Sequence, residues 1–361
     1  MFGVHLSTST TQACRFPRAC ILHAGILHAG IQDPRRPADP ITCLPPEQSI
    51  LSYPYSETLH IRMESQNTIA GAWDTHVHAG PDVTDRKHDV VELARRAADA
   101  GMGGLVLKNH HFPTAMAARL VEDACNADIR LASTIVLNRS VGGLNTDAVV
   151  AAAEMGVSRV ELPTMTAANN MLEQGEPRTI ELLDDDDVLR DPVRTVLDEA
   201  VANDLVVGTG HVGIDEVEAV VTTVVEELNA DVIITHPEFH AARDGIGLTP
   251  SKQAELAQPG VYFERCSIVN DESVRELFLD DAPASAHEAF ADGGMFDHIV
   301  AGIEATGPEH NLLSTDYGQP GRESPPDALA AFHGDLEAAG VPREDIVRMA
   351  RENPQRLFGG T

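Results

Sequence analysis

The sequence predicts an α/β protein folded as a (β/α)8 barrel. From Ala72 onward, short apolar segments alternate with amphipathic ones, which is the pattern of βα units. Eight apolar segments of this kind occur, and a (β/α)8 barrel needs about 250 residues, fewer than the 361 present. Hydrophobic residues make up 43% of the chain, enough for a substantial core. Eight strands favour a closed barrel over an open doubly wound sheet, which is the alternative for an alternating pattern.

The expected strands are short and rich in Val, Leu and Ile. They are Trp73–His78, Gly104–Lys108, Leu131–Leu137, Val157–Leu162, Leu205–Gly210, Val232–Thr235, Val261–Arg265 and Asn311–Ser314. Between and after them we expect helices at Asp89–Ala100, Ala115–Ala124, Thr146–Met155, Val193–Ala202, Asp215–Leu228, Ser251–Leu256, Pro326–Ala339 and Arg343–Asn353. The first of these shows the helical spacing, since Val90, Leu93, Ala94 and Ala97 share one face and Gly101 follows its end.

Residues 1–68 lack this periodicity and are expected to form an N-terminal extension outside the barrel domain at 69–361. The segment contains a tandem duplication of Ile21–Gly25 in Ile26–Gly30, and it carries many prolines. We interpret it as disordered, or as the product of a start codon assigned too far upstream. In the second case Met63 would serve as the start, and residues 1–62 would be absent from the native protein.

The composition restricts the partners and the compartment. A formal charge of −30 disfavours binding to nucleic acid, because the surface repels phosphate. The few lysines and many carboxylates indicate a halophilic protein in a salt-rich cytoplasm, with an ordinary acidic cytosolic enzyme as the alternative. Five irregularly spaced cysteines indicate a reducing compartment. Because no apolar run approaches the roughly 18 residues of a membrane span, we expect a cytoplasmic protein that acts on a small molecule; a homo-oligomer is compatible with the sequence.

The strongest local motif is Asp74-Thr75-His76-Val77-His78 in the first expected strand. Side chains alternate along a strand, so His76 and His78 should face the same side. Two neutral imidazoles placed in this way can bind one cation such as zinc. A pair of buried, hydrogen-bonded histidines is the alternative interpretation of this motif alone.

The same residue types recur where later expected strands end. His211 follows the fifth strand, His236 follows the sixth and Asp316 follows the eighth. In a barrel the carboxyl ends of all strands reach one face, so these distant side chains should converge. Each could separately be a helix cap or a satisfied polar group, but their combination with His76 and His78 predicts a metal site.

This pattern resembles the amidohydrolase superfamily, whose members carry HxH on strand one, histidines after strands five and six and an aspartate after strand eight. The resemblance covers about residues 72–360 and implies metal ligation by His76, His78, His211, His236 and Asp316. The ending Asn353–Gly359 is similar to the closing segment of TatD-like and related branches. The loop Lys108-Asn109-His110-His111 resembles an uncharacterised branch, so no substrate is implied.

Four further residues are expected at the same face. The superfamily takes a metal-bridging ligand from strand four, where Glu161 ends an apolar run. Lys108 ends the second strand, and we expect it to bind substrate or stabilise charge, with a carbamate bridging two metals as the alternative. His110 and His111 follow on the same loop as expected substrate contacts. Glu264 and Arg265 in strand seven are weaker candidates for substrate contacts, and a surface or capping role is the alternative for Glu161.

The predicted function is metal-dependent hydrolysis of an amide, lactone or other ester-like bond in a small molecule. A divalent cation, zinc first and manganese, iron or nickel as alternatives, would activate water, and Asp316 would take its proton. One or two ions are compatible with the residues. Three other functions remain open at this stage: a metal-dependent decarboxylase or lyase on the same barrel, a phosphoesterase with more ligands, and a non-catalytic metal-binding barrel.

Overall fold

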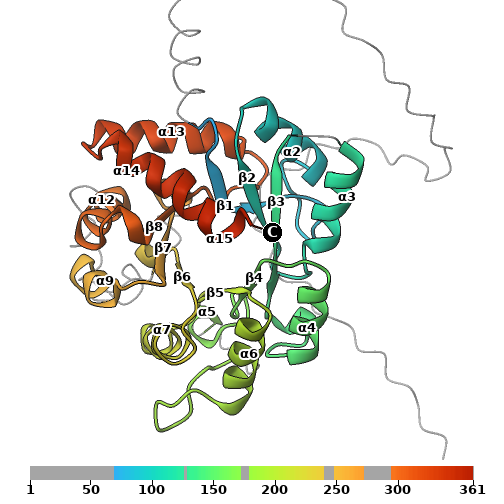
Figure 1. Ribbon diagram of the computed structural model, residues 1–361, viewed down its shortest axis with the longest axis vertical. Helices are drawn as coiled ribbons and strands as arrows, with labels where there is room; N and C mark the ends of the chain where they lie inside the picture. The colour runs from blue at the N-terminus through green and yellow to red at the C-terminus, as the bar shows by residue number, and fades with distance from the viewer. Residues whose placement is uncertain (1–68, 126–127, 172–178, 240–247, 272–293, 361) are drawn as a thin grey trace, which may run out of the picture. The chain divides into compact units, whose positions relative to one another are not determined.

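A computed structural model describes residues 69–125, 128–171, 179–239, 248–271 and 294–360. They belong to the compact unit Tyr55–Thr361. Eight parallel strands follow one another in the sheet in sequence order and form a nearly closed barrel, with helices packed outside it (Figure 1). The predicted fold class is therefore confirmed. The extension predicted at residues 1–68 lies outside the described residues.

All eight predicted strands are present, and four of them have the predicted bounds. The strands are β1 Trp73–His78, β2 Gly104–Lys108, β3 Arg130–Val136, β4 Arg159–Glu161, β5 Val206–Gly208, β6 Val232–Thr235, β7 Val261–Cys266 and β8 Asn311–Ser314. Each pairs in parallel with the next along the chain. Their carboxyl ends consequently meet at one face, which is the mouth of the barrel.

The barrel is closed by the segment that directly follows β8. The backbone N–H of Asp316 donates to the carbonyl oxygen of His76 in β1 at 2.8 Å. The carboxylate of Asp74 accepts hydrogen bonds from the backbone N–H of Thr315 at 3.0 Å and from its hydroxyl at 2.5 Å. These contacts fix the last strand end against the first, so that Asp316 lies beside the β1 histidines.

The helices follow the predicted order with small shifts at their ends. They are α2 Val90–Asp99, α3 Ala115–Cys125, α4 Thr146–Glu154, α5 Ala168–Met171, α6 Asp191–Ala202, α7 Ile214–Val221, α9 Pro250–Leu256, α12 Gly294–Thr306, α13 Pro325–Ala338, α14 Arg343–Val347 and α15 Asn353–Phe358. Two helices contain π-helical turns, Thr222–Glu227 after α7 and Arg348–Glu352 after α14. Helices α5, α12 and α15 were not predicted, although Met295, Ile299 and Ile303 of α12 are buried at helical spacing.

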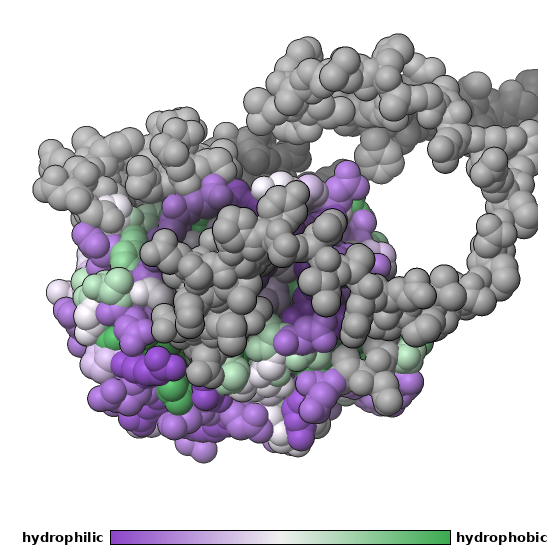
Figure 2. Space-filling model, turned by 90° about the horizontal axis from the view of Figure 1, so that it is seen from above, coloured by the Kyte–Doolittle hydropathy of each residue, from purple (hydrophilic) through white to green (hydrophobic). Residues whose placement is uncertain are grey.

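Three apolar clusters of buried residues pack against the strands. Two large apolar clusters fill the space between the strands and the helices. A smaller cluster includes residues from seven of the strands and consists of Trp73, Val106, Ala132, Val206, Ile233, Tyr262, Leu312 and Phe358. Hydrophilic residues predominate on the described part of the face in Figure 2, as expected for so acidic a chain. Among the described helices, none has both the length and the apolarity to cross a bilayer.

Candidate metal centre at the barrel mouth

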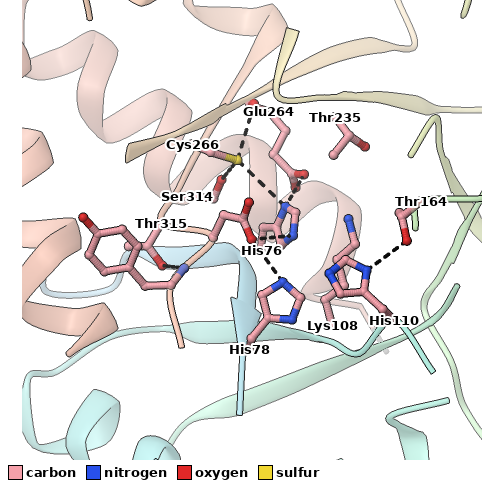
Figure 3. Close-up of polar contacts among 12 residues, drawn as sticks. His76, His78, Lys108, His110, Thr164, Thr235, Glu264, Cys266, Ser314 and Thr315 are labelled. Carbon is pink, nitrogen blue, oxygen red and sulfur yellow. Dashed lines mark hydrogen bonds and ion pairs between the residues drawn. The ribbon is translucent and has the colours of Figure 1, made fainter. Parts of the chain in front are cut away.

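Three ligand atoms from β1 and the end of β8 meet at the mouth. The Oδ1 atom of Asp316 lies 3.1 Å from Nε2 of His76 and 3.0 Å from Nε2 of His78. Both imidazoles are labelled in Figure 3. Asp316 adopts a left-handed conformation with φ 56°, which aspartate tolerates better than most residues. The sequence prediction that these three distant side chains converge therefore agrees with the geometry.

The second ring nitrogen of His76 is held by a carboxylate. Its Nδ1 atom lies 3.0 Å from Oε2 of Glu264, whose other oxygen accepts from Thr75 at 3.2 Å and from Arg159 at 2.6 Å. Glu264 is ionised, because Arg159 and His76 outweigh its burial and lower its pKa. A proton on Nδ1 therefore points at Glu264, which leaves Nε2 as the nitrogen that a cation would bind in place of a proton.

Burial and charge set the protonation of this group. Burial opposes a charge on His76, but the carboxylates of Asp316 and Glu264 outweigh it and raise the pKa of the imidazole. For His78 burial dominates and lowers the pKa to about 4. Burial would raise the pKa of Asp316, but His76 and His78 hold it well below its usual range. An ionised aspartate beside two imidazoles is a set of ligands that a divalent cation would bind.

The donor set fits a divalent cation. Metal–ligand distances of about 2.0–2.1 Å in a tetrahedral site place ligand atoms about 3.3 Å apart, close to the separations found here. Imidazole that donates its second N–H to a carboxylate is the usual arrangement of a metal-bound histidine. Cys266 lies 3.8 Å from Nδ1 of His76, but burial raises the pKa of its thiol well above the usual range, which makes it a poor ligand.

Five imidazoles form a closed ring around the mouth. Neighbouring ring centroids are 5.3 Å apart for His76 and His78, 4.9 Å for His78 and His110, and 6.0 Å for His110 and His211. The circle closes through His236, which lies 4.9 Å from His211 and 6.2 Å from His76. Burial lowers the pKa of His110 and His211 well below the usual value, so both are neutral. Neutral imidazoles are available as ligands or as hydrogen-bonding groups.

The outcome differs among the other predicted residues. His111 contacts the ring of Phe112 at 6.4 Å, and its described contacts do not include the five-histidine ring. Lys108 donates to Oε1 of Glu161 at 3.1 Å, and both side chains are buried. The same carboxylate oxygen accepts from Thr235 at 2.6 Å. The predicted roles of Lys108 and His111 toward substrate stay predictions.

Glu161 is surrounded by donors. Its Oε2 atom pairs with Nε of Arg159 at 2.6 Å, and its Oε1 atom also accepts from the backbone N–H of Gly210 at 3.1 Å. Burial would raise its pKa, but Arg159 and Lys108 outweigh burial and lower it. Within the described residues, the clusters able to hold a metal do not include Glu161. Its bridging role stays a prediction. In the structure Glu161 forms buried ion pairs with Arg159 and Lys108.

The two candidates from β7 lie on opposite sides of the strand. Glu264 contacts His76 inside the barrel, whereas Arg265 donates to Glu238 at 2.7 Å and to Asn311 at 2.7 Å. The guanidinium also lies against Gly302 of α12 in the helical layer. The prediction that Arg265 faces substrate at the mouth is therefore wrong. Successive residues of a strand point to opposite faces, so both could not have faced the mouth.

Arg159, which joins Glu161 to Glu264, was not predicted from the sequence. It lies in the apolar run Val157–Leu162, where a charged residue is costly unless it is paired. The carboxylates of Glu161 in the same apolar run and of Glu264 in another were the available indication of such pairs. Their register across the barrel decides the pairing, and this is visible only in the structure.

The fold and site together define a (β/α)8 barrel with a histidine- and carboxylate-lined mouth that can hold a divalent metal. Residues 71–264 match the family of unknown function DUF6282, which is more than half of the chain, and the protein belongs to this family. A search of curated proteins found no match. The TatD-like similarity predicted from the C-terminal segment receives no support from these matches.

Solved structures share the fold at low identity. A candidate 2-pyrone-4,6-dicarboxylic acid hydrolase from Pseudomonas putida is 15% identical and has a TM-score of 0.51, with 80% of this chain and 98% of that chain covered. An amidohydrolase from Pseudomonas aeruginosa is 11% identical, with a TM-score of 0.54 and coverage of 82% and 97%. These similarities establish the barrel architecture.

Proposed function

We propose that the protein is a metal-dependent hydrolase of the amidohydrolase type, acting on an amide, lactone or other ester-like bond of a small molecule. The observation that carries the proposal is the meeting of His76, His78 and Asp316 at the mouth, with Glu264 holding the outer nitrogen of His76. The names of the two structural neighbours describe an amidohydrolase and the hydrolysis of a 2-pyrone, which is a cyclic ester. Both names are compatible with this chemistry.

The chain would hold one divalent cation, with zinc favoured by the imidazole and carboxylate donors. When bound, such a cation lowers the pKa of water and polarises the bond to be cleaved. His76 and His78 would hold it through Nε2, and His211 and His236 lie on the same ring of imidazoles. Glu264 fixes the orientation of His76.

Asp316 is the residue placed to move a proton. Its carboxylate is ionised at neutral pH, because His76 and His78 lower its pKa despite burial. It lies at the mouth with 14% of its side chain exposed, so it can reach a water molecule from the open side. A carboxylate in this position takes a proton from water and delivers it to the leaving group.

The double variant His76→Ala/His78→Ala tests the proposal. We expect it to fold but to lose its tightly bound metal, measured by elemental analysis of purified protein, together with hydrolysis of a pooled panel of amides, lactones and esters. His310→Ala serves as the control, because His310 bonds the carbonyl oxygen of Val261 at the opposite end of the strands. Full stoichiometric metal in the double variant would refute the site.

The same panel separates the alternative chemistry. A decarboxylase or lyase on this barrel would use the same ligands, so carboxylic acids are included and carbon dioxide is measured. Release of carbon dioxide without hydrolysis of any panel member would replace the hydrolase proposal.

A further inference from the structure

We propose that His110 donates a hydrogen bond from Nε2–H to the reacting group of the substrate, in a ring tautomer fixed by Asn138 and Thr164. His110 would be a catalytic residue, and Asn138 and Thr164 would be positioning residues. The inference rests on the proposed function for its reaction. Its structural part, the tautomer, stands on hydrogen bonds alone.

The orientation of the Asn138 amide is fixed by three donors. Its Oδ1 atom accepts from the backbone N–H groups of Thr164 at 3.0 Å and Thr166 at 3.1 Å, and from the Thr166 hydroxyl at 2.9 Å. A flipped amide would set its NH2 group against two backbone donors, which is unfavourable. The NH2 group therefore points the other way, toward Thr164 and His110.

The hydroxyl of Thr164 accepts a hydrogen bond from Asn138 and must donate its own hydrogen elsewhere. Asn138 Nδ2 donates to Thr164 Oγ1 at 2.7 Å and to the carbonyl oxygen of His110 at 2.9 Å. The hydroxyl hydrogen of this fully buried threonine needs an acceptor of its own. Within the described part of the chain, the remaining contact of Oγ1 is with Nδ1 of His110, at 2.9 Å. Thr164 therefore donates to Nδ1, and Nδ1 carries no proton.

A neutral imidazole whose Nδ1 accepts must carry its proton on Nε2. Figure 3 shows the second ring nitrogen of His110 on the side of the ring away from Thr164, facing the space beside His76 and His78. The opposite tautomer would leave the buried hydroxyl without an acceptor, which costs about 1–3 kcal/mol. The network thus aims one preorganised N–H donor into the mouth.

The position suits a donor to developing negative charge. The ring of His110 lies 4.9 Å from that of His78 and 6.0 Å from that of His211, so it borders the metal centre without joining a described metal-binding cluster. His110 is therefore placed to donate to an oxygen that gains charge during hydrolysis.

Nitrogen-15 NMR of protein with labelled histidine rings tests the tautomer directly. The His110 signals are identified by their loss in His110→Gln. We expect Nδ1 to be unprotonated and Nε2 protonated at pH 7 in the wild type and in Thr164→Ser, and the pattern to be lost in Thr164→Val. Thr166→Val is the matched control, because it removes a hydroxyl from the same network while Asn138 keeps two backbone donors. A proton on Nδ1 in the wild type would overturn the inference.

Kinetics on a substrate from the panel test the role. His110→Leu should lower kcat by about 10²–10³ with bound metal unchanged, which is the effect of removing one such donor. Thr164→Val should lower kcat more than it raises KM, and Thr164→Ser should restore kcat. An unchanged kcat in His110→Leu would refute the donor role. A wild type that hydrolyses no panel member would count against the hydrolase, whereas an active enzyme with a proton on Nδ1 would overturn this inference alone.

Discussion

The carboxylate of Glu264 in β7 lies 3.0 Å from Nδ1 of His76 in β1, across the interior of the barrel. The register of β1 against β2 shifts between Asp74 and Val77, in the segment that contains His76. In this irregular segment the adjacent residues Thr75 and His76 both reach Glu264. A metal ligand and the residue that orients it are therefore supplied by strands that are distant in sequence.

Replacing Glu264 by glutamine should weaken metal binding without removing a ligand. Residues that orient a metal-bound histidine typically contribute 10–100-fold in affinity, so we expect Glu264→Gln to raise the Kd for zinc by about that factor. Competition with a chromophoric chelator measures the change. Glu238→Gln is the matched control, because Glu238 is equally buried but pairs with Arg265 in the helical layer. Equal zinc affinity in both variants would contradict the assignment.

Lys108→Met should destabilise the fold while the metal site remains. It removes one partner from the buried pair with Glu161, and breaking such a pair costs about 3–5 kcal/mol. Lys108→Met/Glu161→Gln should recover part of this free energy of unfolding, measured by urea denaturation. For the partly exposed pair of Lys252 and Glu218, Lys252→Met should change stability by about 1 kcal/mol or less. Loss of metal in Lys108→Met at unchanged stability would indicate a direct role for Lys108 at the metal.

Much of the metal centre could be predicted, because residues of the types that bind metals occur in the sequence where the expected strands end. Parallel strands in a barrel end at one face, so His76, His211, His236 and Asp316 were expected together. The role of Glu264 could not be predicted, since it depends on the irregular register of β1.

The tautomer of His110 was equally inaccessible to the sequence, although His110 was expected at the mouth. It depends on hydrogen bonds from the loops after β3 and β4, and loop geometry follows no period that a sequence pattern reveals. The bounds of four strands were predictable for a different reason. The apolar runs are short and are bounded by polar or glycine residues, as at Gly104 and Lys108.

Gly210→Ala should destabilise the protein and disturb the position of His211. Gly210 has φ 67°, and an added Cβ would collide with the carbonyl oxygens of Leu162 and Pro163. Gly156→Ala is the control, because Gly156 has φ 90° and open space around its Cβ position. The control measures the backbone strain alone, which costs about 1–2 kcal/mol of unfolding free energy. Gly210→Ala should lower the free energy of unfolding by more than this. Equal losses of unfolding free energy would show that the collision is relieved.

Metal-free protein should lose stability as the pH falls below 6.5. Burial lowers the pKa of His78 to about 4 and the pKa of His110 and His211 well below the ordinary value. The unfolded chain therefore binds more protons than the folded chain in this range, and acid favours unfolding. His76 acts in the opposite direction because its pKa is raised, so its contribution is present below pH 6.5 and is lost at higher pH.

Urea denaturation of chelator-treated protein at pH 5, 6 and 7 measures this dependence. Each neutral histidine contributes up to about 1.4 kcal/mol per pH unit. Burial raises the pKa of Asp74 to about 7, so Asp74 acts in the same direction as His76, and three imidazoles oppose these two groups. The free energy of unfolding should therefore decrease on acidification, and the slope should be smaller in His110→Gln/His211→Gln. An unchanged slope in His110→Gln/His211→Gln would mean that these two imidazoles are charged in the folded protein. Charged imidazoles could not serve as the neutral ligands and donors that the proposed hydrolase requires.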